Sequence, residues 1–294
     1  MINFREVTLD DKSKIQDIIC KSGCHGADYN FTNIYLWRDI YKLLISFYDD
    51  RLLVTFPHDN FLYSYPKGAG DVKSVIELLK NDAHSHGAKL VIRGLTEKTL
   101  EEFLPLYESE FTIEEDRNNA DYIYSAEKLT SLSGRKLSSK RNHIKHFERN
   151  GNWKLERINE ANIDEAKSFL KLFYQKKDDA DLESEKIAID EMFKNYEILE
   201  FLGALLYQNE KPVAFSAGTL LDEITMNVHF EKALYNITGA YTMINREFAR
   251  LACDTYKSIE FFNREEDMGI PGLRRAKESY QPDILLMKYT AYEK

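Results

Sequence analysis

Apolar and polar residues follow the same order in two parts of the chain. Alternation typical of a strand begins at Phe4 and leads through Asp11, a residue type that often caps helices, into an apolar stripe with helical spacing. An equivalent strand begins at Leu155 and leads into a second stripe of the same spacing. The stripe residues are Ile15, Ile18 and Ile19 in the first part and Ala166, Phe169 and Leu170 in the second. The pattern therefore predicts an internal repeat, although the two parts share almost no identical residues.

Each part continues with two strands joined by a turn, a third strand, a long helix and two further strands. In the first part these elements are expected at residues 43–48, 52–56, 61–65, 71–86, 90–93 and 122–125. In the second part they are expected at residues 202–207, 213–217, 225–230, 240–256, 259–263 and 285–289. This order predicts an α/β (α+β) fold in which each part is a mixed sheet flanked by helices. It is typical of the Gcn5-related N-acyltransferase (GNAT) fold, that of the acyl-CoA N-acyltransferases.

We therefore expect two tandem GNAT-like domains, residues 1–130 and 151–294, with a basic connecting segment at 131–150. Between residues 135 and 149 the chain has six Lys or Arg residues, two His residues and a single acid. One interpretation is a solvated amphipathic helix that buries Ile144 and Phe147. The other is a binding site for the phosphates of a cofactor or of RNA, and its candidate residues are Arg135, Lys136, Lys140, Arg141 and His143.

Composition narrows the class of protein. Of 294 residues 43% are hydrophobic, enough for a large core, and the net charge of −9 argues against nonspecific binding of polyanions by the whole surface. Apolar runs stay shorter than the roughly 20 residues of a membrane-spanning helix, and the first residues do not resemble a secretory signal. Three cysteines, too few for a disulfide framework or a zinc site, fit a reducing compartment. We expect a cytoplasmic protein without a bound metal or transmembrane segment.

The turn before the second long helix is a candidate cofactor site. Backbone N–H groups at the start of a helix can bind a pyrophosphate, and Gly239 would let it approach closely. Acyl-CoA transferases have Arg/Gln-x-x-Gly-x-Gly/Ala at this place, where this chain has Asn236-x-x-Gly239-x-Tyr241. The candidate residues for acyl-CoA or CoA are Phe230, Asn236, Ile237, Thr238, Gly239, Ala240 and Tyr241. A glycine that only eases the turn is the structural alternative.

Two residues on the preceding strand are candidates for acid–base chemistry. His229 and Glu231 are two positions apart, so in a regular strand they share one face. A structural histidine is the alternative interpretation. The sequence has no nucleophile elbow, Walker loop or His-Glu-x-x-His motif, which argues against serine hydrolases, P-loop nucleotidases and zincins.

Three segments resemble a known family. Residues 28–38, 132–144 and 263–282 are similar to the phosphatidylglycerol lysyltransferase C-terminal domain family, in particular to its soluble bacterial branch, and the resemblance covers essentially the whole chain. It implies two tandem acyltransferase-like domains and a relation to the Fem-type aminoacyltransferases, which take aminoacyl groups from tRNA. The Fem Phe-Lys-x-x-Phe-like segment is similar to residues 276–280, so the resemblance implies a catalytic role for Lys277.

The chain also departs from this family. It has no transmembrane region like that of the membrane lysyltransferases, and this difference argues against a lipid acceptor. Its altered glycine loop argues against ordinary use of acetyl-CoA.

We expect an acyl- or aminoacyltransferase. It would move an acyl group from a CoA thioester, or from an aminoacyl-tRNA ester as the alternative donor, to an amine or hydroxyl of a small-molecule or aminoacyl acceptor. The other hypothesis is a noncatalytic GNAT-fold module that binds tRNA or a CoA-like ligand.

Overall fold

The chain forms two units, and each unit combines segments that are distant in sequence. The computed structural model describes residues 2–59, 61–175 and 181–294. Unit 1 comprises Met1–Asp121, Glu266–Gly269 and Leu286–Lys294, and unit 2 comprises Tyr122–Glu265 and Ile270–Leu285. The basic segment therefore belongs to unit 2. The division into domains at residues 1–130 and 151–294, which the sequence led us to expect, stays a prediction.

Unit 1 contains a mixed sheet with the strand order β1-β2-β3-β5-β12. Neighbouring strands are antiparallel, except that β3 and β5 are parallel. The strands are β1 (Leu44–Tyr48), β2 (Arg51–Phe56), β3 (Leu62–Ser64), β5 (Val91–Leu95) and β12 (Ile284–Glu293), with β4 (Lys67–Gly68) on β2 and much of β6 (Phe111–Ser125) in the same unit. The helices are α1 (Lys12–Ser22), α2 (Phe31–Tyr41), α3 (Val72–Ser85) and α4 (Glu97–Tyr107), with short 3-10 turns at Leu9–Asp11 and Ala27–Tyr29.

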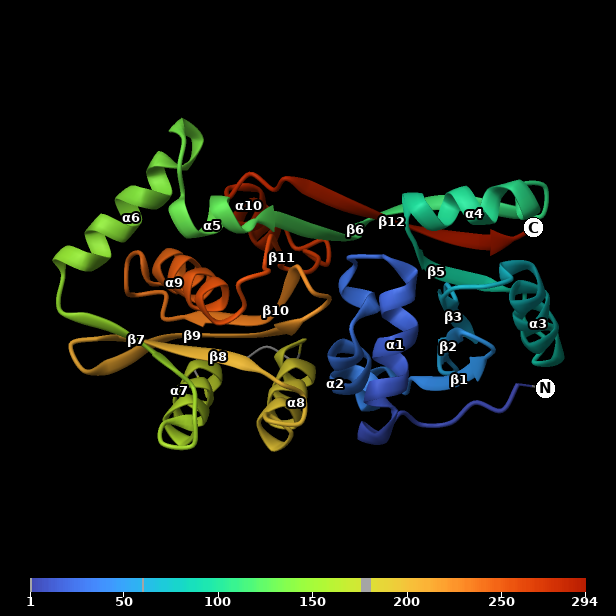
Figure 1. The fold of residues 1–294 in the computed structure, drawn as a ribbon, viewed down its shortest axis with the longest axis horizontal. Coiled ribbons are helices and arrows are strands. Elements are labelled where there is room, and N and C mark those ends of the chain that lie inside the picture. Colours follow the sequence, from blue (N-terminus) through green and yellow to red (C-terminus); the bar gives the residue numbers. More distant parts are fainter. Residues whose placement is uncertain (1, 60, 176–180) are drawn as a thin grey trace. The chain divides into compact units, whose positions relative to one another are not determined.

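In unit 2 the strands are again mixed, in the order β7-β8-β9-β10-β11 followed by the end of β6. Strands β10 and β11 are parallel, and the other neighbours are antiparallel. The strands are β7 (Trp153–Arg157), β8 (Leu202–Gln208), β9 (Lys211–Leu220), β10 (Thr225–Ala233) and β11 (Phe261–Asn263). The helices are α5 (Ala126–Ser131), α6 (Ser138–Arg149), α7 (Ile163–Gln175), α8 (Asp181–Lys194), α9 (Ala240–Thr255) and α10 (Pro271–Glu278), with a 3-10 turn at Arg135–Leu137. Helix α9 covers one face of this sheet, and α7 and α8 cover the other (Figure 1).

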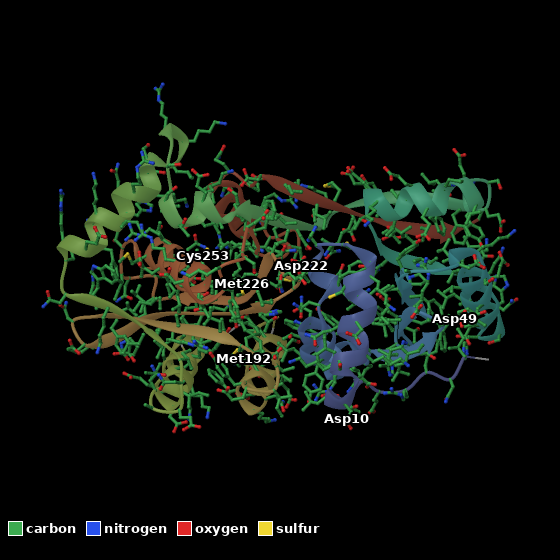
Figure 2. All side chains as sticks on the ribbon, in the orientation of Figure 1. Asp10, Asp49, Met192, Asp222, Met226 and Cys253 are labelled. Atoms are coloured by element: carbon green, nitrogen blue, oxygen red, sulfur yellow. The ribbon has the colours of Figure 1, made fainter. Side chains whose placement is uncertain are left out.

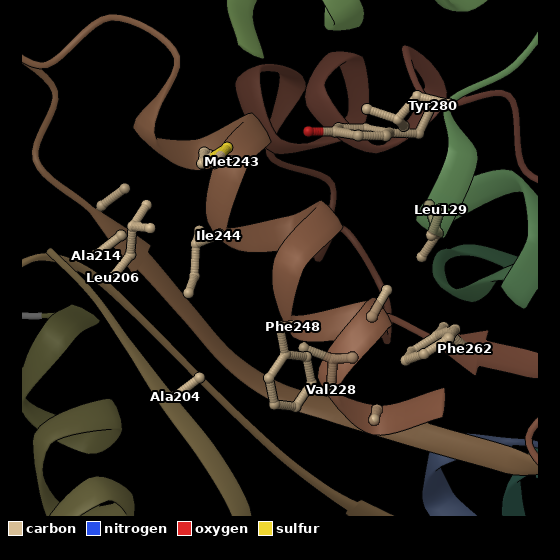
Figure 3. Packing of buried hydrophobic residues seen from close by; sticks show 14 of the residues in the cluster. Leu129, Ala204, Leu206, Ala214, Val228, Met243, Ile244, Phe248, Phe262 and Tyr280 are labelled. Carbon is tan, nitrogen blue, oxygen red and sulfur yellow. The ribbon is translucent and has the colours of Figure 1, made fainter. Parts of the chain in front are cut away.

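The core of unit 2 lies between α9 and the strands beneath it. Met243, Ile244 and Phe248 share one face of α9 and belong to the same buried cluster as β-strand residues such as Ala214 and Val228 (Figure 3). Small side chains on the strands let the helix approach the sheet closely. On the other face, Met192 of α8, labelled in Figure 2, is fully buried.

Both predicted hairpins, both third strands and both long helices are confirmed. The strand expected at Phe4 is wrong, because this region contributes only an isolated bridge between Arg5 and Ile45. The final strands also differ from a simple repeat. Residues 122–125, expected to close the first part, lie in unit 2, and residues 286–289, expected to close the second, lie in unit 1.

One ion pair fixes the beginning of unit 1. Two nitrogens of the Arg5 guanidinium contact the Asp11 carboxylate at 2.5 and 2.8 Å, and the same carboxylate accepts from the backbone N–H of Thr8 at 2.8 Å. The hydrogen bond from Arg5 lowers the pKa of Asp11 to about 2. A carboxyl group with a lowered folded-state pKa stabilises the fold above its unfolded pKa, and this stability is lost as the pH falls through the folded value.

We expect Asp11→Asn to lower the free energy of unfolding at neutral pH by about 1 kcal/mol, a modest loss because Arg5 is half exposed. The difference between wild type and variant should shrink between about pH 4 and pH 2, where the wild-type carboxylate becomes protonated. Urea unfolding across this range measures it. A difference that stays constant with pH would show that Asp11 titrates normally.

Candidate functional site

Strands β10 and β11 separate in the middle of unit 2. They pair only over Thr225–Asn227 and Phe261–Asn263, whereas β10 runs on to Ala233. Ligands of α/β sheets commonly bind where neighbouring parallel strands end. The polar residues at this point are Asn227, His229, Glu231, Arg264 and Glu265, and we call them the divergence site.

An ion pair lies across the divergence site. The guanidinium of Arg264 contacts the Glu231 carboxylate at 2.8 Å, and Asn245 of α9 donates to the other carboxylate oxygen at 3.0 Å. The guanidinium carbon of Arg264 lies 5.0 Å from the ring centroid of Tyr280 and 5.7 Å from that of Tyr124. Burial by itself opposes the charge of Arg264, but chiefly the Glu231 carboxylate outweighs it, so the pKa of Arg264 is raised.

His229 belongs to a different group of contacts. Its Nε2 lies 2.8 Å from the hydroxyl of Thr219, and its Nδ1 lies 3.2 Å from the Glu265 carboxylate. Asn227 donates to the same Glu265 oxygen at 2.7 Å. A β-bulge between Val228 and Phe230 interrupts the alternation of β10. His229 and Glu231 consequently have separate partners, and the shared face expected from their spacing is wrong.

Lys277 of α10 is buried and holds the turn that carries two site residues. Its ammonium donates to the carbonyl oxygens of Arg264 and Glu265 at 2.5 and 3.0 Å. Glu265 has a φ of 57°, a left-handed conformation that costs a residue with a Cβ some strain. Through these contacts Lys277 supports the backbone of the divergence site. The catalytic roles of Lys277, Glu231 and His229 stay predictions.

Gly239 lies against the backbone of α6. It caps α9 with a φ of 89°, and a Cβ at this position would lie 2.3 Å from the carbonyl oxygen of His143 and 3.1 Å from the Cβ of Phe147. Helix α6 thus fills the space that a side chain at position 239 would need. This packing supports the structural interpretation of Gly239.

The other candidate cofactor residues differ in exposure. Asn236 and Thr238 are exposed, Ile237 and Tyr241 are partly buried, and Phe230 and Ala240 are buried. Their role in binding a cofactor stays a prediction.

The basic segment forms an amphipathic helix, and its candidate residues divide between two sides. Ile144 and Phe147 of α6 are buried, as the amphipathic pattern predicts, whereas Arg135, Lys136 and His143 are exposed. Arg141 donates to the carbonyl oxygens of Leu132 and Gly134 at the end of α5. Binding of RNA or another anion by these residues stays a prediction.

Lys140 is the member of the set that approaches the divergence site. Its Nζ lies 3.8 Å from the ring centroid of Tyr280, the ring that Arg264 also approaches. Burial, and then the charge of Arg264, lower the pKa of Lys140 to about 8. Arg264, Asn245 and Tyr280 were not among the candidate site residues. The sequence signals for Arg264 were its place directly after a predicted strand and within the segment 263–282, which resembles the family and also contains Tyr280.

A groove of about 620 Å³ lies elsewhere in unit 2, between α7 and α8. Its floor contains Leu170 and Phe193, and lysines line its rim. Three of these lysines pair with acids on their own helices, as Lys167–Asp164, Lys186–Glu183 and Lys194–Glu191. The lysines of the groove are thus largely paired on their own helices, whereas the polar groups suited to chemistry gather at the divergence site.

The described ranges 2–59, 61–175 and 181–294 contain no group of three or more His, Cys, Asp or Glu residues arranged to hold a metal ion. No helix in the same ranges is long and apolar enough to cross a membrane.

The fold is that of tandem GNAT proteins. A tandem GNAT protein from the clavulanic acid biosynthesis pathway superposes with a TM-score of 0.52 at 7% identity, covering 99% of this chain and 98% of that one. FemX superposes with a TM-score of 0.63 at 8% identity, covering 100% and 98%. The expected fold class is confirmed.

The chain belongs to the family described as phosphatidylglycerol lysyltransferase, C-terminal, which matches residues 22–292. The C-terminal domain of a putative lysylphosphatidylglycerol synthetase from Agrobacterium fabrum has a TM-score of 0.66 at 13% identity, covering 97% of this chain and 92% of that one. A conserved protein of unknown function from Bacteroides thetaiotaomicron has a TM-score of 0.92 at 34% identity over the full length of both chains. Family and fold together point to an acyl- or aminoacyltransferase.

A curated relative is an uncharacterized protein of Mycoplasmoides gallisepticum, which is 24% identical over 208 residues. The match covers 68% of this chain and 64% of the relative, so the chain spans less than two thirds of that protein.

The contact of α6 with Gly239 can be tested by adding one methyl group. We expect Gly239→Ala to lower the free energy of unfolding more than Gly134→Ala, by roughly 1–3 kcal/mol. Both glycines have similar positive φ values, but only the new Cβ at position 239 would meet a backbone atom, since nothing lies within 4 Å at position 134. Urea unfolding of the two variants measures the difference. Equal losses would mean that α6 does not lie tightly on this turn.

Proposed function

We propose that the chain transfers an aminoacyl group from an aminoacyl-tRNA ester to an amine or hydroxyl acceptor, at the divergence site of unit 2. The observation that carries this proposal is the position of α6. A CoA pyrophosphate in the expected place would bind at the start of α9, where α6 lies against Gly239. The segment that leads into α6 and the helix itself present Arg135, Lys136 and His143 to solvent, and such a surface suits the phosphates of RNA.

The family description supports the choice of the transferred group. It names lysyl transfer to phosphatidylglycerol, so lysine is the first aminoacyl group to test, and phosphatidylglycerol is one acceptor among amines and hydroxyls. A lysyl ester is already activated, so transfer needs neither a metal nor a further cofactor.

The step is a direct displacement. The acceptor nitrogen or oxygen attacks the ester carbonyl carbon and forms the new bond, and its proton passes to the carboxylate of Glu231. The bond between the carbonyl carbon and the ribose oxygen then breaks, and that oxygen takes up the proton from Glu231, which restores the carboxylate. Arg264 and Asn245 hold the Glu231 carboxylate in place. Positioning of the two reactants supplies much of the rate enhancement.

Lys277 and His229 have positioning roles in this proposal. Lys277 holds the carbonyl groups of residues 264 and 265, and His229 holds the Glu265 carboxylate. Both side chains are buried, so their effect on the acceptor and the donor passes through Arg264 and Glu265.

We expect lysyl-tRNA to bind and to lose its lysine in an acceptor-dependent reaction. Glu231→Gln should slow this transfer by about 100-fold, the typical contribution of a general base, while binding of charged tRNA is retained. The matched control is Glu223→Gln, which changes an exposed acid of the same unit and should leave the rate unchanged. Release of labelled lysine and filter binding measure the two effects.

Other outcomes decide between the alternatives. Binding of tRNA without transfer to any amine or hydroxyl acceptor would indicate the noncatalytic binding module. Turnover of acetyl-CoA in place of lysyl-tRNA would contradict the choice of donor. A Glu231→Gln variant as fast as the wild type would remove Glu231 from the reaction.

A further inference from the structure

Two positively charged side chains approach the Tyr280 ring at the divergence site, and both have unused hydrogen-bonding capacity. One terminal nitrogen of Arg264, NH1, is buried and has no hydrogen-bond partner. The ammonium of Lys140 lies on the face of the Tyr280 ring, 3.8 Å from its centroid, rather than against a carboxylate. Buried donors nearly always have an acceptor in folded proteins, so an unpaired donor here calls for one.

The charges around these groups do not cancel. Glu231 is the carboxylate that faces both cations, and it is already bound by the other terminal nitrogen of Arg264 and by Asn245. Tyr280 and Tyr124 add no negative charge at neutral pH, because burial raises the pKa of Tyr280 to about 12 and also raises that of Tyr124. Two cations thus share one carboxylate.

Solvent reaches the edge of the site, although NH1 of Arg264 itself is buried. The side chains of Arg264 and Glu231 are 12% and 11% exposed, and Lys140 is half-buried at the same place. Lys140 comes from α6 and Arg264 from the end of β11, so a small ligand would be held between two separate elements.

We propose that Lys140 and Arg264 form a binding site for an oxyanion, a phosphate or a carboxylate group. Such a group would accept from Nζ of Lys140 and, with a shift of the side chains that cover the buried NH1, also from Arg264. Both would be charge-assisted hydrogen bonds of the stronger kind. The group would also neutralise the excess positive charge beside Glu231. The site goes beyond the proposed transfer reaction and does not depend on it, because both cations have these contacts in the free protein.

Calorimetric titration with inorganic phosphate and, separately, with acetate at constant ionic strength tests this site. We expect the wild type to bind at least one of them, and Lys140→Met to bind it about tenfold or more weakly. The control is Lys145→Met, which removes an exposed charge from the same helix and should bind like the wild type. Preference for phosphate or for acetate identifies the group that the site accepts. No binding of either anion, or equal binding by Lys140→Met, would overturn the proposal.

A second measurement covers the case in which Lys140→Met fails to fold. The pKa of Lys140 is followed by NMR after isotopic methylation of the lysines, with Lys140→Arg, which keeps the charge, used to assign its signal. The free protein should titrate at about 8, and bound phosphate should raise this value by about one unit, because an anion favours the charged amine. A pKa that phosphate leaves unchanged would also overturn the proposal.

Discussion

The ion pair between Glu231 and Arg264 lies where two parallel strands separate, and the chemistry proposed for unit 2 depends on it. Sheet hydrogen bonds between β10 and β11 end at Asn227 and Asn263, so side chains must hold the structure beyond that point. The ion pair with Glu231 links Arg264 to β10, and Lys277 holds the backbone carbonyl groups of residues 264 and 265. A buried ion pair is costly to desolvate, which makes it a weak source of stability and a natural place for function.

Helix α6 imposes the second constraint. Its backbone rests on Gly239, so the start of α9 packs against protein on that side. The same helix brings Lys140 to Tyr280, on the edge of the divergence site. The basic segment therefore has exposed basic residues on its outer side and Lys140 on its inner side. The net charge of the chain does not reveal this division.

Much of the fold was predictable because helices and strands leave a clear period in the sequence. The long helix α9 and the two hairpins follow directly from apolar spacing. It was not predictable that residues 122–125 lie in unit 2 and residues 286–289 in unit 1. Alternation shows which residues of a strand are buried, but not which strands it pairs with. The bulge at His229 adds one residue to β10, and this breaks the two-residue spacing from which a shared face with Glu231 was expected.

The site itself was only partly within reach of the sequence. Lys140, Ile144 and Phe147 have the spacing of one helix face, so the inward position of Lys140 could have been read from its two buried neighbours. Arg264 could not be singled out, because its importance comes from contacts with Glu231 and two tyrosines that are distant in sequence. Only folding brings such residues together.

The most direct test of the account is a crystal structure with lysine joined by a stable amide bond to 3′-amino-adenosine, which mimics the end of lysyl-tRNA. The account predicts that the aminoacyl carbonyl lies at the ends of β10 and β11, with Glu231 or Arg264 within about 3 Å of the ligand. Binding in the groove between α7 and α8, or in unit 1, would contradict the placement of the reaction at the divergence site.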